Sequence, residues 1–357
     1  MTVEILDQAK VQAFAGKLIG VLNDAALALM TSIGHQTSLF DVMASLPPAT
    51  PPEIAQAAGL HERYVREWLG AMTVGGVIEH DSNTGTYRLP PEHATWLTRD
   101  AGTNNLATQM QFIPLLGSVE PGIVESFRNG GGVPYAEYPR FQRVMGDSSA
   151  MVHDSRLIDT ILPLVSGLPE RLRSGIEALD IGCGQGHAVN LMAKTYPSSN
   201  FRGYDISEQG IATARKEAGK LGIANAEFTL KDLATMDEVS AYDLITAFDV
   251  IHDQAKPAHV LDAVFRALKP NGVFLMVDVR ASSHVHDNID HPLGPFLYTV
   301  STMHCMTVSL AQHGEGLGTV WGEQKALQML ANAGFKAVEV HQVEGDIVNN
   351  YYICRKT

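Results

Sequence analysis

The 357-residue sequence has only three cysteines, and no C-x-x-C pair occurs among them. This scarcity argues against a disulfide framework and against a cysteine-rich zinc site. Long apolar runs are also missing. The most apolar early stretch, residues 18–33, is interrupted by Asn23 and Asp24, so it falls short of the roughly 20 apolar residues that cross a bilayer. The first residues lack the basic start of a signal peptide. We therefore expect a cytoplasmic protein with no membrane partner.

Positive charge is the second deficit, with 26 Lys and Arg residues against 39 Asp and Glu residues and a net charge of −13. An acidic surface repels phosphate backbones, so we expect no nucleic-acid partner. Hydrophobic residues make up 45% of the chain and charged residues 18%, proportions that exclude a largely disordered protein. The length suggests two domains with a bridging segment.

Residues 1–45 are predicted to be helical. Their apolar residues recur at spacings of three and four and form one stripe: Phe14, Leu18, Val21, Leu22, Ala25, Leu29 and Ile33. Such a stripe packs either against a partner subunit or against the protein's own core, and the sequence leaves both possibilities open.

From residue 49 onward the pattern becomes helix, turn, helix and hairpin. Thr50, followed by two prolines and a glutamate, is typical of a helix N-cap. A second helix is predicted over residues 61–75, and residues 77–90 carry an Asn/Gly turn between two short strands. This order indicates a winged helix. Acidic residues outnumber Lys and Arg in residues 1–110, which disfavours DNA binding. We therefore assign residues 1–100 to a winged-helix domain that dimerises or covers the substrate.

Residues 101–170 are predicted to form a mostly helical bridge. Three consecutive glycines at 130–132 interrupt it and introduce a loop that contains Tyr135 and Tyr138. An alternating α/β pattern follows the bridge, so residues 171–357 form the third segment.

A glycine-rich turn opens the α/β segment. Residues 176–181 form a short apolar strand, which is followed by Gly182, Gly184 and Gly186 and then by a helix from about residue 187. Glycines let the backbone pass close to a ligand, and the free N–H groups of the helix start face that ligand.

Asp205 ends the second predicted strand, 205 − 186 = 19 residues beyond the last glycine of the turn. A carboxylate at this distance accepts hydrogen bonds from ribose hydroxyls. Alternatively, the tripeptide Asp205-Ile206-Ser207 caps the next helix.

Five predicted strands of parallel type are followed by a closing antiparallel hairpin. The last three of the five end near Asp232, Asp249 and Asp278, and the hairpin covers residues 335–342 and 349–356. The predicted fold is a doubly wound, Rossmann-like α/β sheet. Ligands of such sheets bind at the carboxyl ends of the strands.

These motifs together resemble those of class I S-adenosylmethionine-dependent methyltransferases. The matching elements are LDIGCGQG, YDIS, KDL, DLITAFDV and LKPNG. A dinucleotide fingerprint would place its third glycine one position later, and a P-loop would carry a Lys after the turn. With the winged helix in front, the chain is similar to two-domain bacterial methyltransferases and to small-molecule O-methyltransferases.

The resemblance implies S-adenosyl-L-methionine as cofactor and S-adenosyl-L-homocysteine as product. It also implies a small-molecule acceptor that is methylated at oxygen or nitrogen. In the relatives the winged helix dimerises and helps to close the substrate pocket, so a homodimer is expected.

The resemblance further implies a set of cofactor contacts. Gly182, Gly184 and Gly186 would lie under the methionine and ribose portions of the cofactor. The other contacts would be Asp180 at the amino end, Asp205 on the ribose hydroxyls, Ile206 against the adenine, Asp232 and Leu233 at the adenine amino group, and the carbonyl of Phe248 on the ammonium.

Methyl transfer to an O–H or N–H group requires an aligned acceptor and a base for its proton. His252 and Asp253 follow the fourth strand and match the His-Asp pair of small-molecule O-methyltransferases, in which the His is the general base. His252 is therefore the candidate base, with a pocket-lining or helix-capping role as the alternative. Asp253 could orient its ring, and Asp278 or Glu323 could do so from farther along the chain.

Residues 281–320 form an insert that contains five of the fourteen histidines. Their spacing lacks a metal-binding E-x-x-H pair, so we expect no metal. A helix is predicted over residues 294–311, and the insert follows the fifth strand, where class I enzymes have substrate-covering segments. The predicted substrate-lining residues are His291, Tyr298, Ser301, Thr302 and Cys305 from the insert and Tyr135, Tyr138 and Phe141 from the bridge.

Two other functions would use similar parts. A cofactor-sensing winged-helix transcriptional regulator is the first alternative, but it would need a basic recognition helix and wing. A nicotinamide-dependent enzyme is the second, and both His187 and the closing hairpin disfavour it.

Overall fold

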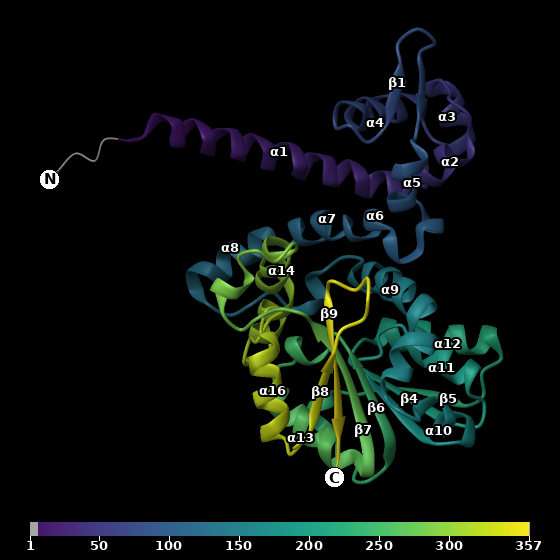
Figure 1. Cartoon of the computed structure of the whole chain (residues 1–357), viewed down its shortest axis with the longest axis vertical. Coiled ribbons are helices and arrows are strands. Elements are labelled where there is room, and N and C mark those ends of the chain that lie inside the picture. Colours follow the sequence, from purple (N-terminus) through teal and green to yellow (C-terminus); the bar gives the residue numbers. More distant parts are fainter. Residues whose placement is uncertain (1–5, 357) are drawn as a thin grey trace, which may run out of the picture. The chain divides into compact units, whose positions relative to one another are not determined.

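The computed structural model describes residues 6–356 and consists of two compact units, residues 1–115 and 116–357 (Figure 1). The first unit contains the expected winged helix. The second joins most of the expected bridge to the α/β segment. The finer division into residues 1–100, 101–170 and 171–357 stays a prediction.

The first unit has the element order of a winged helix, as predicted. Its elements are α1 (Gln8–Gln36), α2 (Leu39–Ser45), α3 (Pro51–Ala58), α4 (Glu62–Val74), β1 (Glu79–Asp81), β2 (Thr86–Arg88), α5 (Pro91–Leu97), η1 (Arg99–Asn104) and α6 (Leu106–Gln109). Helix α3 begins in a capping box, because Glu53 accepts hydrogen bonds from the main-chain N–H of Thr50 (2.8 Å) and from its hydroxyl (2.6 Å). The indole N–H of Trp68 donates to the carbonyl of Met30 (2.8 Å), and the ring packs edge-on against Phe40. These contacts hold α4 against α1 and α2.

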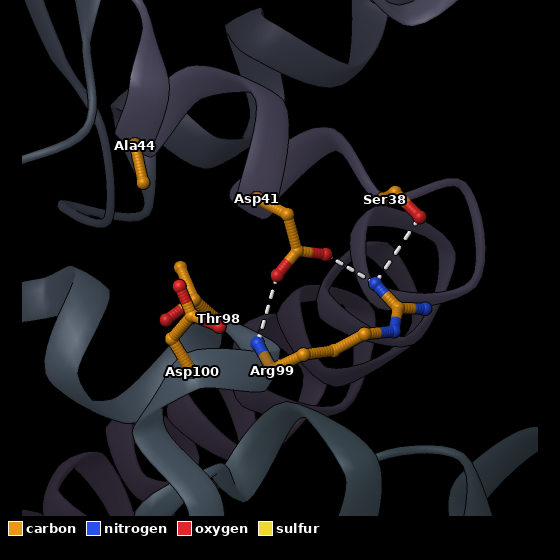
Figure 2. Close-up of a pocket in the computed structure, with 6 residues that line it drawn as sticks. All are labelled: Ser38, Asp41, Ala44, Thr98, Arg99 and Asp100. Carbon is orange, nitrogen blue, oxygen red and sulfur yellow. Dashed lines mark hydrogen bonds and ion pairs between the residues drawn. The ribbon is translucent and has the colours of Figure 1, made fainter.

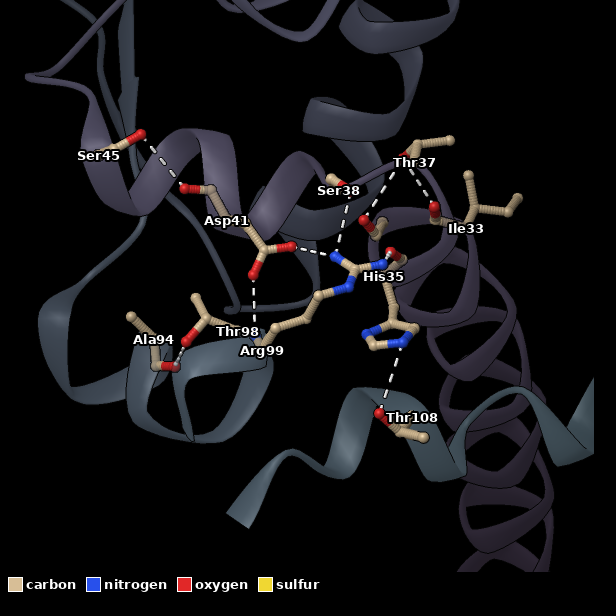
Figure 3. A network of polar contacts seen from close by, with 11 residues as sticks. Ile33, His35, Thr37, Ser38, Asp41, Ser45, Ala94, Thr98, Arg99 and Thr108 are labelled. Atoms are coloured by element: carbon tan, nitrogen blue, oxygen red, sulfur yellow. Dashed lines mark hydrogen bonds and ion pairs between the residues drawn. The ribbon is translucent and has the colours of Figure 1, made fainter. Parts of the chain in front are cut away.

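A polar cluster around Arg99 joins α1, α2 and η1 (Figures 2 and 3). The guanidinium donates to the carbonyl of His35 (2.8 Å) and to the hydroxyl of Ser38 (3.1 Å), and it pairs with Asp41. The main-chain N–H of Arg99 donates to the other carboxylate oxygen of Asp41 (2.8 Å). A cavity of about 330 Å³ lies here, lined in part by Ser38, Asp41 and Arg99. Because the charged groups satisfy each other, the cluster serves to fix the helices.

The predicted helix over residues 1–45 begins outside the described residues, which start at residue 6, and its described part is divided at Ser38, whose left-handed φ of 60° separates α1 from α2. Most of the predicted stripe on α1 is exposed, with relative exposures of 40–69% for Phe14, Leu18, Val21, Leu22, Leu29 and Ile33. The stripe is therefore not part of the core of this chain. Among the described helices, α1 alone is long and apolar enough to cross a membrane, judged by length and composition.

Helices form the start of the second unit. They are α8 (Glu120–Asn129), η2 (Tyr135–Glu137), α9 (Phe141–Val152), η3 (His153–Ile161), η4 (Leu162–Leu164) and α10 (Leu168–Ser174), while α7 (Phe112–Gly117) contains the boundary between the units. The loop that follows the three glycines carries Tyr135 and Tyr138, as the sequence predicted.

A seven-stranded sheet forms the centre of the second unit, in the order β5-β4-β3-β6-β7-β9-β8. The strands are β3 (Glu177–Ile181), β4 (Asn200–Asp205), β5 (Ala226–Leu230), β6 (Tyr242–Phe248), β7 (Leu268–Val279), β8 (Val338–His341) and β9 (Asn349–Arg355). Strands β3 to β7 pair in parallel, whereas β9 pairs antiparallel with both β7 and β8. This confirms the predicted Rossmann-like methyltransferase sheet.

Helices cover both faces of this sheet (Figure 1). Helices α10 (given above), α11 (His187–Thr195) and α12 (Glu208–Leu221) lie on one face, and α13 (Pro257–Ala267) and α16 (Gly322–Asn332) on the other. The remaining elements are η5 (Leu233–Thr235), η6 (Ile251–Asp253), η7 (Val285–Asn288), α14 (Gly294–Val300), η8 (Ser301–Cys305) and α15 (Met306–Ala311). The last three form one continuous helical stretch over the predicted range 294–311. Each face of the sheet has its own apolar core, so the edge where the strands end is free for a site.

Candidate active site at the carboxyl edge of the sheet

The parallel register brings the predicted site residues to one edge. Ile181 of β3 pairs with Tyr204 of β4 and with Ala247 of β6, so the next residue of each strand emerges at the same level. Those next residues are Gly182, Asp205 and Phe248. Further along the same edge Phe248 pairs with Val277, which places Asp249 beside Asp278.

The glycine turn needs its glycines for two reasons. Gly182 and Gly186 have φ values of 66° and 75°, which side chains rarely adopt. A Cβ at Gly182 would also lie 2.4 Å from a methyl group of Val250, and one at Gly186 would lie 2.4 Å from the Cβ of Ala214. The turn can therefore lie close to the sheet edge only without side chains at these positions.

Asp205 is fixed by the turn itself. Its Oδ2 accepts from the main-chain N–H of Gly184 (2.8 Å), and its Oδ1 accepts from that of Ser207 (2.7 Å). The cap of α12 is Ser207, whose hydroxyl accepts from the N–H of Gly210 (3.1 Å). Burial raises the pKa of Asp205, while these N–H groups oppose the rise. Each carboxylate oxygen keeps capacity to accept a further hydrogen bond, which a ribose would supply.

The other predicted cofactor residues lie at or just beyond the carboxyl ends of strands β3, β4, β5 and β6. Asp180 is buried and accepts from the hydroxyl of Thr246 (2.6 Å), and burial raises its pKa to about 7. Ile206 is 60% exposed beside the turn, whereas Leu233 is buried. Asp232 is exposed and accepts from the N–H of Ala234 (2.9 Å), which caps η5. Phe248 is half-buried with its ring against that of His153 (4.8 Å between centroids).

His252 is buried and bound to a carboxylate from the neighbouring strand. Its Nδ1 lies 2.8 Å from Oδ1 of Asp278, and the indole N–H of Trp321 donates to the same oxygen (3.0 Å). Because an ionised carboxylate only accepts, Nδ1 carries a hydrogen and Nε2 is the ring nitrogen that can accept a proton. Burial opposes the charged imidazole, but the Asp278 carboxylate and, after it, Cys305 outweigh burial and raise the pKa of His252 well above its usual value.

The acid adjacent in sequence does not orient this ring. Asp253 accepts instead from the side-chain amide of Gln254 (3.1 Å), and burial raises its pKa to about 6. Glu323, the other distant candidate, accepts from the amide of Asn350 (2.9 Å). Of the three acids considered from sequence, Asp278 is the one that contacts His252.

Four aromatic side chains gather beside His252. His304 stacks on Phe141 with 3.9 Å between centroids, and Tyr135 and Tyr138 meet His304 edge-on at 5.8 and 4.8 Å. Burial lowers the pKa of His304 to about 3, so its ring is neutral, and its Nε2 is buried without a hydrogen-bond partner in the described structure. The buried Cys305 lies 3.6 Å from Nδ1 of His304. The predicted bridge residues Tyr135, Tyr138 and Phe141 thus meet the predicted insert residue Cys305.

The other four predicted lining residues make different contacts. The ring nitrogens of His291 bind the carbonyl of Arg280 (3.1 Å) and the N–H of Leu293 (3.1 Å), so His291 organises its own loop. The hydroxyl of Tyr298 accepts from the amide of Asn288 (3.2 Å).

The remaining two, Ser301 and Thr302, lie elsewhere on η8. A Cβ at Gly318 would lie 2.2 Å from the hydroxyl oxygen of Ser301. Thr302 lines a second cavity, of about 540 Å³, together with residues of α8 and α15 that include Phe127 and Met306.

Sequence reasoning missed several residues of the site. Gln142, His153 and Trp321 touch the candidate residues Tyr135, Phe248 and Asp278, and Gln185 touches Gln142. Only Gln185 belongs to a motif, and each of these contacts joins residues distant in the chain except the one between Gln142 and Tyr135. Only the position of Gln185 inside the glycine turn could have suggested it.

The site is acidic. Burial raises the pKa of Asp249 to about 7, and its Oδ1 is inaccessible and has no hydrogen-bond partner among the described residues. Together with Asp180 and Asp253, it makes a region rich in carboxyl groups around one imidazole. Such a region suits a ligand with a sulfonium and an ammonium group, since each uncompensated carboxylate gains a partner.

Comparisons with known families agree with this geometry. Residues 25–99 match the family model described as an Rv2258c-like winged HTH domain, and residues 172–334 match a methyltransferase domain. Among curated proteins, the chain is 29% identical to a ubiquinone biosynthesis O-methyltransferase of Neisseria meningitidis over 31% of this chain and 48% of that one. It is 34% identical to a trans-aconitate 2-methyltransferase of Variovorax paradoxus over 30% of this chain and 38% of that one. The chain thus spans half or less of the length of these relatives.

Solved structures resemble the whole chain in fold. Human N-acetylserotonin methyltransferase in complex with S-adenosylmethionine is 17% identical, with a TM-score of 0.68 over 99% of both chains. An O-methyltransferase family protein of Burkholderia thailandensis is 16% identical, with a TM-score of 0.69 over 96% of this chain and 98% of that one. The chain therefore carries a winged HTH domain followed by a methyltransferase domain, and its fold is that of two-domain methyltransferases.

Proposed function

We propose that the protein is an S-adenosylmethionine-dependent methyltransferase that transfers a methyl group to oxygen or nitrogen of a small molecule. One observation carries the proposal: the glycine turn with Asp205 and the His252–Asp278 pair emerge at the same edge of one parallel sheet. A nucleotide-recognising group and a base thereby lie within one site. The alternative of a cofactor-sensing regulator would not require a buried, carboxylate-bound imidazole there.

The chain's own residues hold the cofactor at both ends in this proposal. Asp205 takes the ribose hydroxyls, and Asp180 with the carbonyl of Phe248 holds the ammonium. Ile206, Asp232 and Leu233 border the adenine, and the three glycines let the backbone approach. When bound, the cofactor supplies a methyl group on a positively charged sulfur. Tyr135, Tyr138, Phe141 and Cys305 surround the acceptor and exclude water from it.

His252 removes the proton from the acceptor. Asp278 fixes the ring so that Nε2 is the free nitrogen, and its negative charge stabilises the imidazolium that forms. Because the pKa of His252 is raised, the base stays protonated to higher pH than an ordinary His does. Turnover should therefore increase as the pH rises through the His252 pKa.

The exposed stripe of α1 packs against a second copy of the chain in this proposal. Contiguous apolar side chains are rarely left in water, and a two-fold pair of α1 helices would cover both stripes. Antiparallel pairing about residues 20–21 would place Lys17 opposite Asp24 of the partner subunit. Gly16 and Gly20 have no atom within 4 Å of a built Cβ, so they leave room for close approach.

Nucleic acid is not the proposed partner of the winged helix, and the proposed location is the cytoplasm. Both arginines of α4 are paired with acids one turn away, Arg63 with Glu67 and Arg66 with Glu62. In the wing Arg88 pairs with Glu79. The recognition surface therefore offers little uncompensated positive charge to a phosphate backbone.

Isothermal titration calorimetry tests the proposed function without knowledge of the acceptor. The protein should bind S-adenosylmethionine and S-adenosylhomocysteine but not NAD. Asp205→Ala should weaken binding by about 1–3 kcal/mol, the scale for a lost charged hydrogen-bond partner. Asp159→Asn, an exposed change on η3, is the matched control and should leave binding unchanged. Binding of NAD without binding of either sulfur compound would refute the proposal.

A further inference from the structure

Two glutamines connect the glycine turn to the acceptor side of the site. The side-chain amide of Gln185, in the turn, donates to the main-chain carbonyl of Gln142 at the start of α9 (2.7 Å). The side-chain amide of Gln142 then donates to the hydroxyl of Tyr135 (2.5 Å). A continuous path of two hydrogen bonds therefore runs from the turn to an aromatic ring of the acceptor cluster.

Helix α9 is shaped to receive Gln185. Its residue facing the amide is Gly146, where a Cβ would lie 3.0 Å from both Cδ and Oε1 of Gln185. The φ of Gly146 is not in the left-handed region, so backbone geometry does not require a glycine at this position. The absence of a side chain instead leaves the space that the Gln185 amide fills.

The same segment is held at its other end by the residue after the turn. Nε2 of His187 lies 2.7 Å from Oδ1 of Asp154, and its Nδ1 lies 3.2 Å from Glu217. The neighbouring His153 packs against Phe248. The turn thus contacts the 135–161 segment on both sides of Gly186.

Tyr135 lies where both substrates would meet. Burial and then the negative charges of Asp205 and Asp253 raise its pKa, so both carboxylates act on the phenol, which stays protonated. Since the hydroxyl accepts from Gln142, its own hydrogen remains available for donation.

We infer that Gln185 is a positioning residue that couples cofactor occupancy of the glycine turn to the placement of Tyr135 in the acceptor site. The inference rests on the proposed function, because the cofactor is what occupies the turn. A bound cofactor holds the turn in one conformation, the turn holds Gln142, and Gln142 holds Tyr135. Cofactor binding at the turn therefore stabilises the placement of Tyr135 in the acceptor pocket.

Hydrogen exchange measured by mass spectrometry tests this on the full chain with S-adenosylhomocysteine alone. In the wild type, the ligand should slow amide exchange in residues 134–142 by about threefold to tenfold, the range that one hydrogen bond contributes. In Gln185→Met, which keeps the size but removes the donor, the slowing should be less than about twofold. The matched control is Gln328→Met, an exposed change on α16, which should behave as the wild type.

A second variant separates coupling from stability. Gly146→Ala should maintain or raise the Tm, because Ala favours a helix interior over Gly. It should nevertheless reduce the ligand-induced slowing, because the added Cβ displaces the Gln185 amide. If Gly146 had only a structural role, the variant would not keep its Tm while losing the ligand-induced slowing of exchange.

The outcomes are distinguishable. If the wild type shows no heat with S-adenosylhomocysteine, the proposed function fails. If the ligand binds and Gln185→Met keeps the full slowing of exchange, the coupling is refuted while the function stands. A loss of ligand affinity of more than about tenfold in Gln185→Met, beyond one hydrogen bond, would make Gln185 a direct cofactor ligand and would also overturn the coupling.

Discussion

Replacing Asp278 by Asn should make the protein less stable in a way that depends on pH. Asn keeps the shape and one acceptor oxygen for Trp321 and His252 but removes the negative charge. His252 then loses the carboxylate that binds its ring, so its pKa should fall. The raised pKa of His252 contributes stability that is fully present below the pKa of an unfolded His, about 6.5, and is lost as pH rises through the folded pKa.

The size of the effect follows from the burial of the pair. The side chains of His252 and Asp278 are 5% and 1% exposed, so solvent screens their interaction little. A hydrogen bond to a charged group contributes about 1.5–3 kcal/mol. For a unit of this size each kcal/mol changes the Tm by about 2–4 °C. We therefore expect Asp278→Asn to lower the Tm by about 3–12 °C at mildly acidic pH, and by less at alkaline pH.

Scanning calorimetry between about pH 5.5 and pH 10 measures this difference on either side of the unperturbed His pKa. A histidine NMR titration of the same variant shows whether the His252 pKa falls. Asp159→Asn, which removes an exposed carboxylate, is the control and should not change the Tm at any pH. A Tm deficit of Asp278→Asn that stays constant across the pH range would refute the ion-pair reasoning.

Three further outcomes are expected. His252→Ala should leave cofactor affinity nearly unchanged in calorimetry and reduce turnover by about 10²–10⁴ once an acceptor is found; a variant with more than about a third of wild-type turnover would exclude the base role. The double change Leu18→Glu and Leu22→Glu should halve the mass seen in sedimentation equilibrium, and a monomeric wild type would contradict the proposed α1 pairing. Arg99→Ala should lower the free energy of unfolding by about 1 kcal/mol, because half-exposed ion pairs contribute little, and chemical denaturation followed by circular dichroism measures this.

Local patterns in the sequence were enough to predict the fold. The alternation of apolar strands and helices predicted the doubly wound sheet, and the capping signal at Thr50 with the hairpin after α4 predicted the winged helix. The glycine turn and Asp205 were also predictable, because their chemistry depends on a fixed spacing across two adjacent strands. Periodicity and turn residues act over short distances along the chain, so one sequence is sufficient to recognise them.

The identity of side-chain partners was not predictable in the same way. His252 precedes Asp253 directly, yet it binds Asp278, 26 residues away on the next strand, because adjacent side chains leave the backbone in different directions. His291 looked suited to a pocket but binds the main chain around its own loop. Residue type and spacing therefore predicted candidate site residues but not which of these residues are in contact.

The sequence by itself determined the two domains' folds, the glycine turn and the list of candidate acids and bases. Tertiary structure alone decided that Asp278 holds His252 and that Tyr138 reaches the carbonyl of Met303, 165 residues away. It also decided that Gln185 meets Gln142 across 43 residues. The physical reason is that these contacts depend on the register of parallel strands and on the packing of α9 and η8 at the sheet edge. Neither the strand register nor this helix packing leaves a periodic signal in the sequence, because each contact involves a single side chain at a single position.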